Sequence, residues 1–300
     1  MLDVTVIILT KDEKQHIGRC LDNVNQFASD VYVVDCFSTD GTQDIAKSYG
    51  ANVIEHQWPG NQAEQFNWAL DNLPINTEWI LRLDADEYLT TDLQEELEEL
   101  IPTVPDRISG LVFPLGRAFM GRVLKHGIVN DVSMIRMFRR GKAHYEHRIM
   151  DEHLLIDGET YTCKGKFIDD NRMPLSFFIQ KHNIYAVKEA ALLLYNEFNL
   201  NSNTGKESST HYATAVERKR SQKNGYARLP LFWRAFAYFC YRYFFKLGFL
   251  DGKEGFLWDF FQGWWYRTLV DAKVLEIKRA CGCDPEKIKT YLEVNCGIKL

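Results

Sequence analysis

The chain has 300 residues, 46% of them hydrophobic and 26% charged, an ordinary globular composition that allows one large domain or a domain with an appendage. Its net charge of −5 excludes a global basic field for nucleic acid. Seven scattered cysteines without a CxxC pair, no apparent signal peptide and no uncharged apolar run near the roughly 20 residues of a membrane span predict a reduced cytosolic protein.

The first hundred residues alternate between short apolar runs and amphipathic segments. The expected strands are residues 4–9, 31–34, 51–55 and 79–83, and the expected helices are residues 14–26, 43–49, 62–73 and 90–101. Asp40 or Thr42 would cap the second helix, and Thr91 with Gln94 resembles a capping box for the fourth. This βαβ order predicts an α/β fold with a doubly wound, mostly parallel sheet.

The middle of the chain is less regular. Further strands are expected within residues 109–140, with residues 132–138 the best candidate, and a long helix is expected at residues 177–199. The polar residues 199–228 suggest a mobile loop that closes over substrates. We therefore expect a catalytic domain at residues 1–225, with a nucleotide-binding half at 1–105 and an acceptor-binding half at 106–225, followed by a helical region at 226–300.

An aromatic segment at residues 229–250 carries only three charges, Arg234, Arg242 and Lys246. On a helix these three fall within about 120° of one another, with an apolar, aromatic surface around the rest. A second aromatic stretch follows at residues 256–266. A basic stripe opposite an aromatic face suits a helix lying in the membrane interface, and packing on the catalytic domain is the alternative.

Acidic residues follow the fourth strand directly, in the run Leu83-Asp84-Ala85-Asp86-Glu87. In open α/β sheets, ligands bind beyond the carboxyl ends of the strands. Carboxylates spaced i, i+2 at such an end can reach one hard cation, which in turn neutralises a diphosphate. A solvated acidic turn is the alternative for an isolated Asp-x-Asp.

Three motifs together resemble the N-terminal signatures of family 2 glycosyltransferases with the GT-A fold. They are residues 6–13 (VIILTKDE), 33–42 (VVDCFSTDGT) and 83–87 (LDADE). Within that family the chain is similar to enzymes of lipopolysaccharide-core, capsule and exopolysaccharide assembly, which also tend to end in an aromatic, basic helical tail. The resemblance implies an inverting hexosyltransferase that moves a sugar from a UDP-sugar to a lipid-linked or lipopolysaccharide-core saccharide, at the inner face of the cytoplasmic membrane.

The same resemblance implies roles for individual residues. Asp35 would accept a hydrogen bond from the base or contact the ribose, with Thr10 and Glu13 beside it, and Gln65 would lie in the base-reading segment. Asp84 and Ala85 would bind the ribose side of the donor, and Asp86 would be the main ligand of Mn²⁺ or Mg²⁺ in this DXD motif. Asp151 is the preferred catalytic base and Glu152 its rival. His153 would assist the metal, and Lys181 and His182 would meet the diphosphate.

Two other functions are the alternatives to a glycosyltransferase. A metal-dependent nucleotidyltransferase-like enzyme would also use paired aspartates, but neither GxGxxG nor GxxxxGK[ST] occurs in the sequence. A non-catalytic, membrane-associated scaffold with a nucleotide-binding fold would have no need for Asp84, Asp86 and Asp151.

Overall fold

The computed structural model describes residues 1–129, 132–146, 154–198 and 229–298. Internal contacts divide the chain into two units, which are described separately below. Unit 1 consists of Met1–Lys125 and Val129–Arg172, and unit 2 consists of His126–Ile128 and Met173–Leu300. The sequence predicts a division near residue 225. The difference arises because α5 (Leu175–Phe198) packs on α9 (Tyr266–Cys281) in unit 2.

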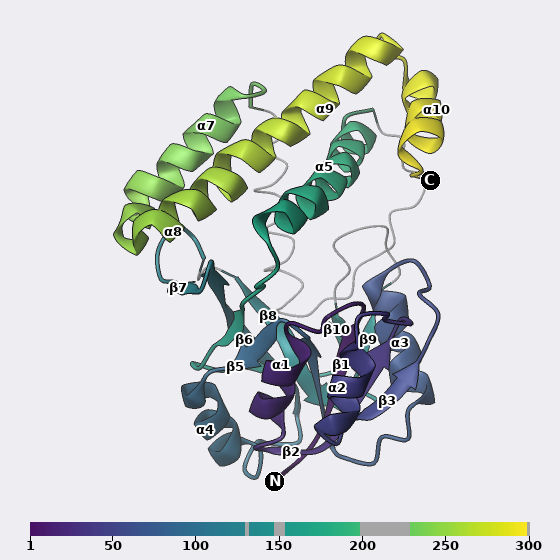
Figure 1. Cartoon of the computed structure of the whole chain (residues 1–300), viewed down its shortest axis with the longest axis vertical. Helices are drawn as coiled ribbons and strands as arrows, with labels where there is room; N and C mark the ends of the chain where they lie inside the picture. The colour runs from purple at the N-terminus through teal and green to yellow at the C-terminus, as the bar shows by residue number, and fades with distance from the viewer. Residues whose placement is uncertain (130–131, 147–153, 199–228, 299–300) are drawn as a thin grey trace. The chain divides into compact units, whose positions relative to one another are not determined.

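Unit 1 is built on a mixed sheet (Figure 1). Its parallel part has the order β3-β2-β1-β4, formed by β1 (Leu2–Thr10), β2 (Ala28–Asp35), β3 (Asn52–Glu55) and β4 (Trp79–Asp84). The path continues through β8 (Ser133–Arg139), β6 (Ile108–Phe119), β12 (Phe167–Asp169) and β5 (Glu87–Leu89). Strand β8 runs antiparallel to both β4 and β6.

Short strands complete this unit. Strands β7 (Arg122–Leu124) and β11 (Glu159–Thr162) pair with β6, whereas β9 (Ala143–Tyr145) and β10 (Leu154–Ile156) form a separate two-stranded sheet. The helices are α1 (Ile17–Val24), α2 (Thr42–Ser48), α3 (Gln62–Asn72) and α4 (Thr91–Leu100). The predicted order of strands and helices is confirmed.

Two predicted helix caps differ in detail from the structure. Helix α4 is capped by Thr90 and not by Thr91, since the Thr90 hydroxyl accepts a hydrogen bond from the Leu93 N–H. At α2 the N-cap position is Gly41, in a left-handed conformation at φ 96°, and the side chain of the preceding Asp40 accepts from the Thr42 N–H.

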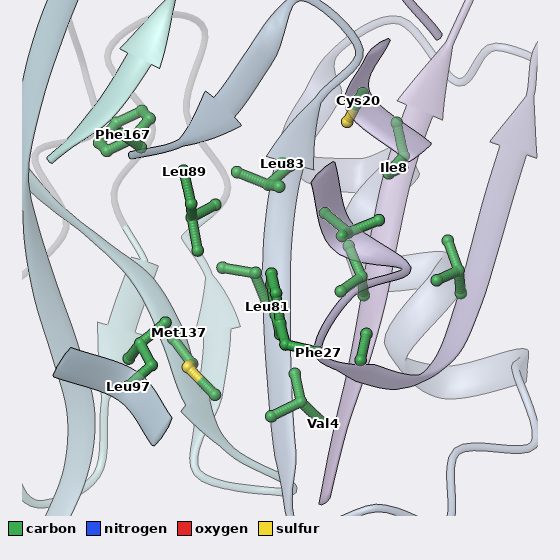
Figure 2. Packing of buried hydrophobic residues seen from close by; sticks show 14 of the residues in the cluster. Val4, Ile8, Cys20, Phe27, Leu81, Leu83, Leu89, Leu97, Met137 and Phe167 are labelled. Atoms are coloured by element: carbon green, nitrogen blue, oxygen red, sulfur yellow. The ribbon is translucent and has the colours of Figure 1, made fainter. Parts of the chain in front are cut away.

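The core of unit 1 explains why these strands form. Val4 and Ile8 on β1 lie beside Leu81 and Leu83 on β4, and all four side chains are fully buried (Figure 2). The parallel register pairs Ile8 with Val33 on one side and with Leu83 on the other. Strands buried on both faces need continuous apolar runs, and this need accounts for the sequence pattern of β1, β2 and β4.

Unit 2 is helical in its described residues. Helix α7 (Trp233–Cys240) continues into the π-helical turn η1 (Tyr241–Phe245), and η2 (Gly248–Asp251) leads into α8 (Gly252–Trp258). A second π-helical segment, η3 (Asp259–Trp265), leads into α9, and α10 (Pro285–Cys296) follows (Figure 1). Apolar residues of α5, α9 and α10 form one core, among them Leu194, Val274 and Leu292. No described helix is long and apolar enough to cross a bilayer.

The expected basic stripe on the aromatic segment is wrong. Arg234 is buried and its guanidinium pairs with Asp271, whose carboxylate also accepts from the Phe232 N–H at 2.6 Å. Arg242 is buried as well, and its Nε donates to Oδ1 of Asp259 at 2.8 Å. Helical periodicity revealed where the arginines lie but not that aspartates on another helical segment neutralise them.

Glycines make room for the second of these ion pairs. A Cβ atom on Gly248 would clash with Oδ2 of Asp259, and one on Gly127, at φ +73°, would lie 2.7 Å from Oδ1. A Cβ on Gly255 would clash with the carbonyl oxygen of Gly248 and lie 2.6 Å from the Cβ of Asp251. The chain therefore closes on Asp259 at distances that only glycine permits.

Candidate functional site

The carboxyl ends of three neighbouring strands meet at one edge of the parallel sheet. In the register of β1 with its neighbours, Thr10 pairs with Asp35 of β2 and Leu9 pairs with Asp84 of β4. The structure thus brings together polar residues that lie far apart in the sequence. This is the edge at which open α/β sheets bind ligands.

Asp35 is fully buried and accepts four hydrogen bonds from the chain itself. Its Oδ2 accepts from the hydroxyls of Thr10 at 2.7 Å and Ser38 at 2.6 Å. Its Oδ1 accepts from the Ser38 N–H at 2.7 Å and from Nε2 of Gln43 at 2.8 Å. These four bonds fill the acceptor capacity of a carboxylate. A base or ribose that bound to Asp35 would have to displace one of these donors, and the Gln43 side chain is the longest and most flexible of them.

Gln65 on α3 is also fully buried. Its Oε1 lies 2.7 Å from Nδ1 of His56, and its Nε2 donates to the sulfur of Cys36 at 3.3 Å. The His56 ring stacks on Trp68 with a centroid separation of 3.8 Å. Gln65 therefore contacts the segment that follows Asp35, where the neighbouring Phe37 is 47% exposed.

Glu13 belongs to a relay of hydrogen bonds at the start of α1. Its Oε2 lies 2.6 Å from Nδ1 of the buried His16, and Nε2 of His16 accepts from the Arg172 N–H at 2.9 Å. Because Nε2 accepts, Nδ1 carries the proton and donates to Glu13. The relay joins the loop after β1 to the segment after β12.

Asp84 lies between two buried arginines, Arg82 and Arg136, which the predicted motifs do not include. Its carboxylate is 3.5 Å from Arg82 and 3.7 Å from Arg136, and 30% of its side chain is exposed. Arg136 also pairs with the buried Glu87, whose Oε2 accepts from the Asp84 N–H at 3.0 Å. Burial raises the pKa of the Glu87 carboxyl, and the charge of Arg136 opposes that rise.

Asp86 is held by a segment that sequence reasoning missed. Its Oδ2 accepts from Nδ2 of Asn171 at 2.8 Å, and its carbonyl oxygen accepts from the Asp170 N–H and from Arg19, both at 3.0 Å. Asp170 in turn pairs with Arg19 and with Nε of Arg172. A signal was present in the sequence, since residues 169–172 form a polar run directly after a strand, as residues 84–87 do.

The paired aspartates fit a hard divalent ion that is shared with a substrate. No group of three His, Cys, Asp or Glu side chains gathers around a metal position among the described residues. Mg²⁺ commonly binds through one or two carboxylates and completes its coordination with substrate phosphates and water. Asp84 and Asp86 supply such a pair at a partly open strand end, whereas the buried Ala85 between them contributes no ligating side chain.

The acceptor-side residues are known only from the sequence. Asp151, Glu152 and His153 lie outside the described residues, as does the expected loop at 199–228. Lys181 and His182 lie on α5 in unit 2. His182 is engaged there, because its Nδ1 lies 2.8 Å from the Phe178 carbonyl oxygen and its Nε2 lies 2.7 Å from Nε2 of Gln262. Its predicted role with a diphosphate stays a prediction.

The sheet and its acidic strand ends define an α/β domain of the type that binds nucleotide ligands at a strand-end edge. Residues 5–144, a little under half of the chain, match the family model described as glycosyl transferase family 2. The family resemblance and the α/β GT-A fold with a helical C-terminal region are thereby confirmed.

Two curated relatives illustrate the match. An uncharacterized glycosyltransferase of Rickettsia typhi is 39% identical over 33% of this chain and 32% of its own length. The match thus spans about a third of that relative. The lipopolysaccharide core biosynthesis glycosyltransferase LpsC of Rhizobium meliloti is 26% identical over 63% of this chain and 71% of its own length.

Among solved structures, glucosyl-3-phosphoglycerate synthase from Mycobacterium tuberculosis, in complex with Mn²⁺, UDP and glucosyl-3-phosphoglycerate, is 18% identical. The superposition covers 38% of this chain and 44% of that chain, with a TM-score of 0.31. So low a score indicates a partial likeness and carries no argument about substrates.

Proposed function

We propose that the protein is an inverting, metal-dependent glycosyltransferase that uses a UDP-sugar as donor. The observation that carries the proposal is the pair Asp84 and Asp86 at the end of β4, with Asp86 fixed by Asn171, inside a family 2 domain. When bound there, Mn²⁺ or Mg²⁺ would supply positive charge to the diphosphate of the leaving nucleotide.

The chain's own groups then have defined tasks. Asp84 is oriented by Arg82, Arg136 and the hydrogen bond from its own N–H to Glu87, so its carboxylate keeps one direction at the end of β4. Thr10 and Asp35 bind the nucleoside. The Gln43 side chain, which donates to Asp35, moves away so that the nucleoside can take its place. Asp151, or else Glu152, takes the proton from the acceptor hydroxyl as that oxygen attacks the anomeric carbon and UDP departs.

The proposed acceptor is a lipid-linked or lipopolysaccharide-core saccharide, and the proposed location is the cytoplasmic face of the inner membrane. Support comes from the likeness to LpsC, whose name assigns it to lipopolysaccharide core biosynthesis. The exposed aromatic residues of unit 2 support a membrane location, since Trp and Tyr favour the bilayer interface.

A thermal-shift screen with UDP-, GDP- and dTDP-sugars, each with and without Mn²⁺, tests the proposal. A ligand that binds only the folded chain raises the melting temperature by mass action. We expect the largest rise with a UDP-sugar and Mn²⁺, and we expect Asp86→Ala to abolish the metal-dependent part. Equal rises without Mn²⁺, or none with any UDP-sugar, would contradict the proposed donor and metal.

A further inference from the structure

Unit 2 exposes an unusual number of large apolar side chains along α7, η1, η2 and α8. This set, called the aromatic face below, consists of Phe232, Trp233, Phe236, Tyr241, Phe244, Phe245, Leu247, Phe249, Leu250, Phe256 and Trp264. The most exposed are Trp233 at 72% and Phe245 at 77%. Soluble monomers rarely expose contiguous apolar patches of more than a few hundred Å².

Ring contacts show that parts of the aromatic face are continuous. The rings of Tyr243 and Phe244 lie 5.1 Å apart, and Tyr243 also contacts Phe249 at 6.1 Å and Phe256 at 5.6 Å. Leu247 lies at the turn between η1 and η2 with φ 59°, a left-handed conformation that is rare for a bulky residue. Such strain tends to persist where function requires it.

Most charges near the aromatic face are buried, and the acid Glu254 on α8 is half-buried. Asp251 and Asp259 are buried, and so are Arg234 and Arg242, each in an ion pair. Lys253 is exposed beside the rings. An apolar aromatic face with a lysine beside it matches the composition of the bilayer interface, where long cationic side chains reach toward phosphate.

A shallow hollow of about 550 Å³, widely open to the surface, lies in the same region. Tyr243, Phe249, Phe256 and Leu257 line it with apolar surface, and Gly252 and Lys253 complete the wall. The hollow combines an apolar interior with one amine at its wall. That chemistry suits an amphiphile with a hydrocarbon chain and an anionic group at one end.

We propose that the aromatic face inserts into the headgroup region of a phospholipid bilayer, with one acyl chain in the hollow and the lipid phosphate at Lys253. The contact rests on apolar burial, because the two arginines that would have attracted anionic lipid are already neutralised by Asp271 and Asp259. The inference deepens the proposed membrane location and rests on it.

Vesicle co-sedimentation with the full chain tests this inference. The double variant Trp233→Ser/Phe245→Ser removes the two most exposed aromatics, and Val294→Ser on α10, which is 75% exposed, is the matched control. Burial of one aromatic side chain corresponds to roughly a tenfold or larger gain in partitioning. We expect the double variant to partition at least about tenfold more weakly into pure phosphatidylcholine vesicles, and Val294→Ser to partition like the wild type.

Salt separates apolar insertion from attraction to anionic lipid. Raising NaCl from about 0.1 M to about 0.5 M shortens the screening length about twofold, so binding through surface lysines would weaken strongly. We expect less than a twofold loss in high salt, and about a twofold loss for Lys253→Gln. A strict need for anionic lipid, loss of binding in high salt, or wild-type binding by the double variant would overturn the proposal.

Two further measurements distinguish the remaining outcomes. Light scattering in the absence of vesicles shows whether the face instead joins two copies of the chain: a dimer that the double variant dissociates, with no vesicle binding, would overturn the proposal. UDP-sugar hydrolysis by the double variant should equal that of the wild type, and Asp86→Ala should still bind vesicles. Failure of the membrane contact is thereby separable from failure of the proposed transfer reaction.

Discussion

Asn171 donates a hydrogen bond from Nδ2 to Oδ2 of Asp86 at 2.8 Å, across 85 positions of sequence. One carboxylate oxygen of Asp86 is thus engaged by the chain, and the direction of the other is fixed. Residues that orient a metal ligand in this way typically affect metal affinity by 10–100-fold. The segment after β12 therefore belongs to the candidate site as much as the DXD motif does.

We expect Asn171→Ala to weaken Mn²⁺ binding in the presence of UDP by about tenfold, because Asp86 loses its orienting donor. Isothermal titration calorimetry measures this affinity directly and needs no acceptor. Asn76→Ala, which removes an exposed asparagine that donates only to the Pro74 carbonyl oxygen, is the control. Unchanged Mn²⁺ affinity in Asn171→Ala would show that the hydrogen bond from Asn171 does not orient a metal ligand.

Two matched substitutions can identify the catalytic base. We expect Asp151→Asn to lower transfer by about 10²–10⁴, because a positioned base contributes that much, while UDP affinity stays nearly unchanged. Glu152→Gln is the matched variant and should keep most of its turnover. The reverse pattern would assign the base to Glu152, and full activity in both variants would place it elsewhere.

The buried pair Arg136–Glu87 should be costly to break. We expect Arg136→Met to lower the free energy of unfolding by about 3–5 kcal/mol, because Glu87 would remain buried without its partner. Arg107→Met is the control, since the Arg107–Glu159 pair is about two-thirds exposed and pairs of that kind contribute under about 1 kcal/mol. Urea unfolding measures both, and similar losses in the two variants would refute this account.

Asp259 should make stability depend on pH. Burial raises the pKa of its carboxyl to about 6, against the opposing charge of Arg242. The folded chain therefore binds more protons than the unfolded chain between about pH 4 and 6, so this group's contribution to stability falls as the pH rises through that window. It is largest below the unfolded pKa and is lost above about pH 6.

Melting temperatures of the wild type and Asp259→Asn across pH 4.5–7.5 test this sign. The variant lacks the titrating group, and its unpaired Arg242 adds an offset that is the same at each pH. We expect the wild type to lose stability relative to the variant as the pH rises. Parallel curves for the two proteins would show that Asp259 titrates alike in the folded and unfolded states.

The sequence predicted the strands and helices of the sheet well, because their signal is local. Continuous apolar runs marked β1, β2 and β4, and the strand-end rule then placed Asp35 and Asp84 at one edge. The predicted basic stripe is wrong because the positions of its arginines depend on partners that are distant in the sequence. Whether Arg234 faces solvent depends on Asp271, 37 positions away on a separate helix, and helical periodicity contains no information about that partner.

The role of Asn171 is hard to predict for a related reason. The polar run at residues 169–172 is a weak signal, because the strand before it, β12 (Phe167–Asp169), has only three residues. The two arginines beside Asp84 lie within the predicted apolar strands. A charged residue in such a buried strand itself indicates a nearby carboxylate partner.

The glycines around Asp259 have a consequence for the evolution of the tail. Gly248, Gly255 and Gly127 each pack so closely that one added methyl group would meet the ion pair or the neighbouring backbone. Gly127 and Gly248 cannot change to alanine while Asp259 remains. In homologues we therefore expect these glycines and the aspartate to be kept or lost together. A homologue that lacks Asp259 should also have residues other than glycine at positions 127 and 248.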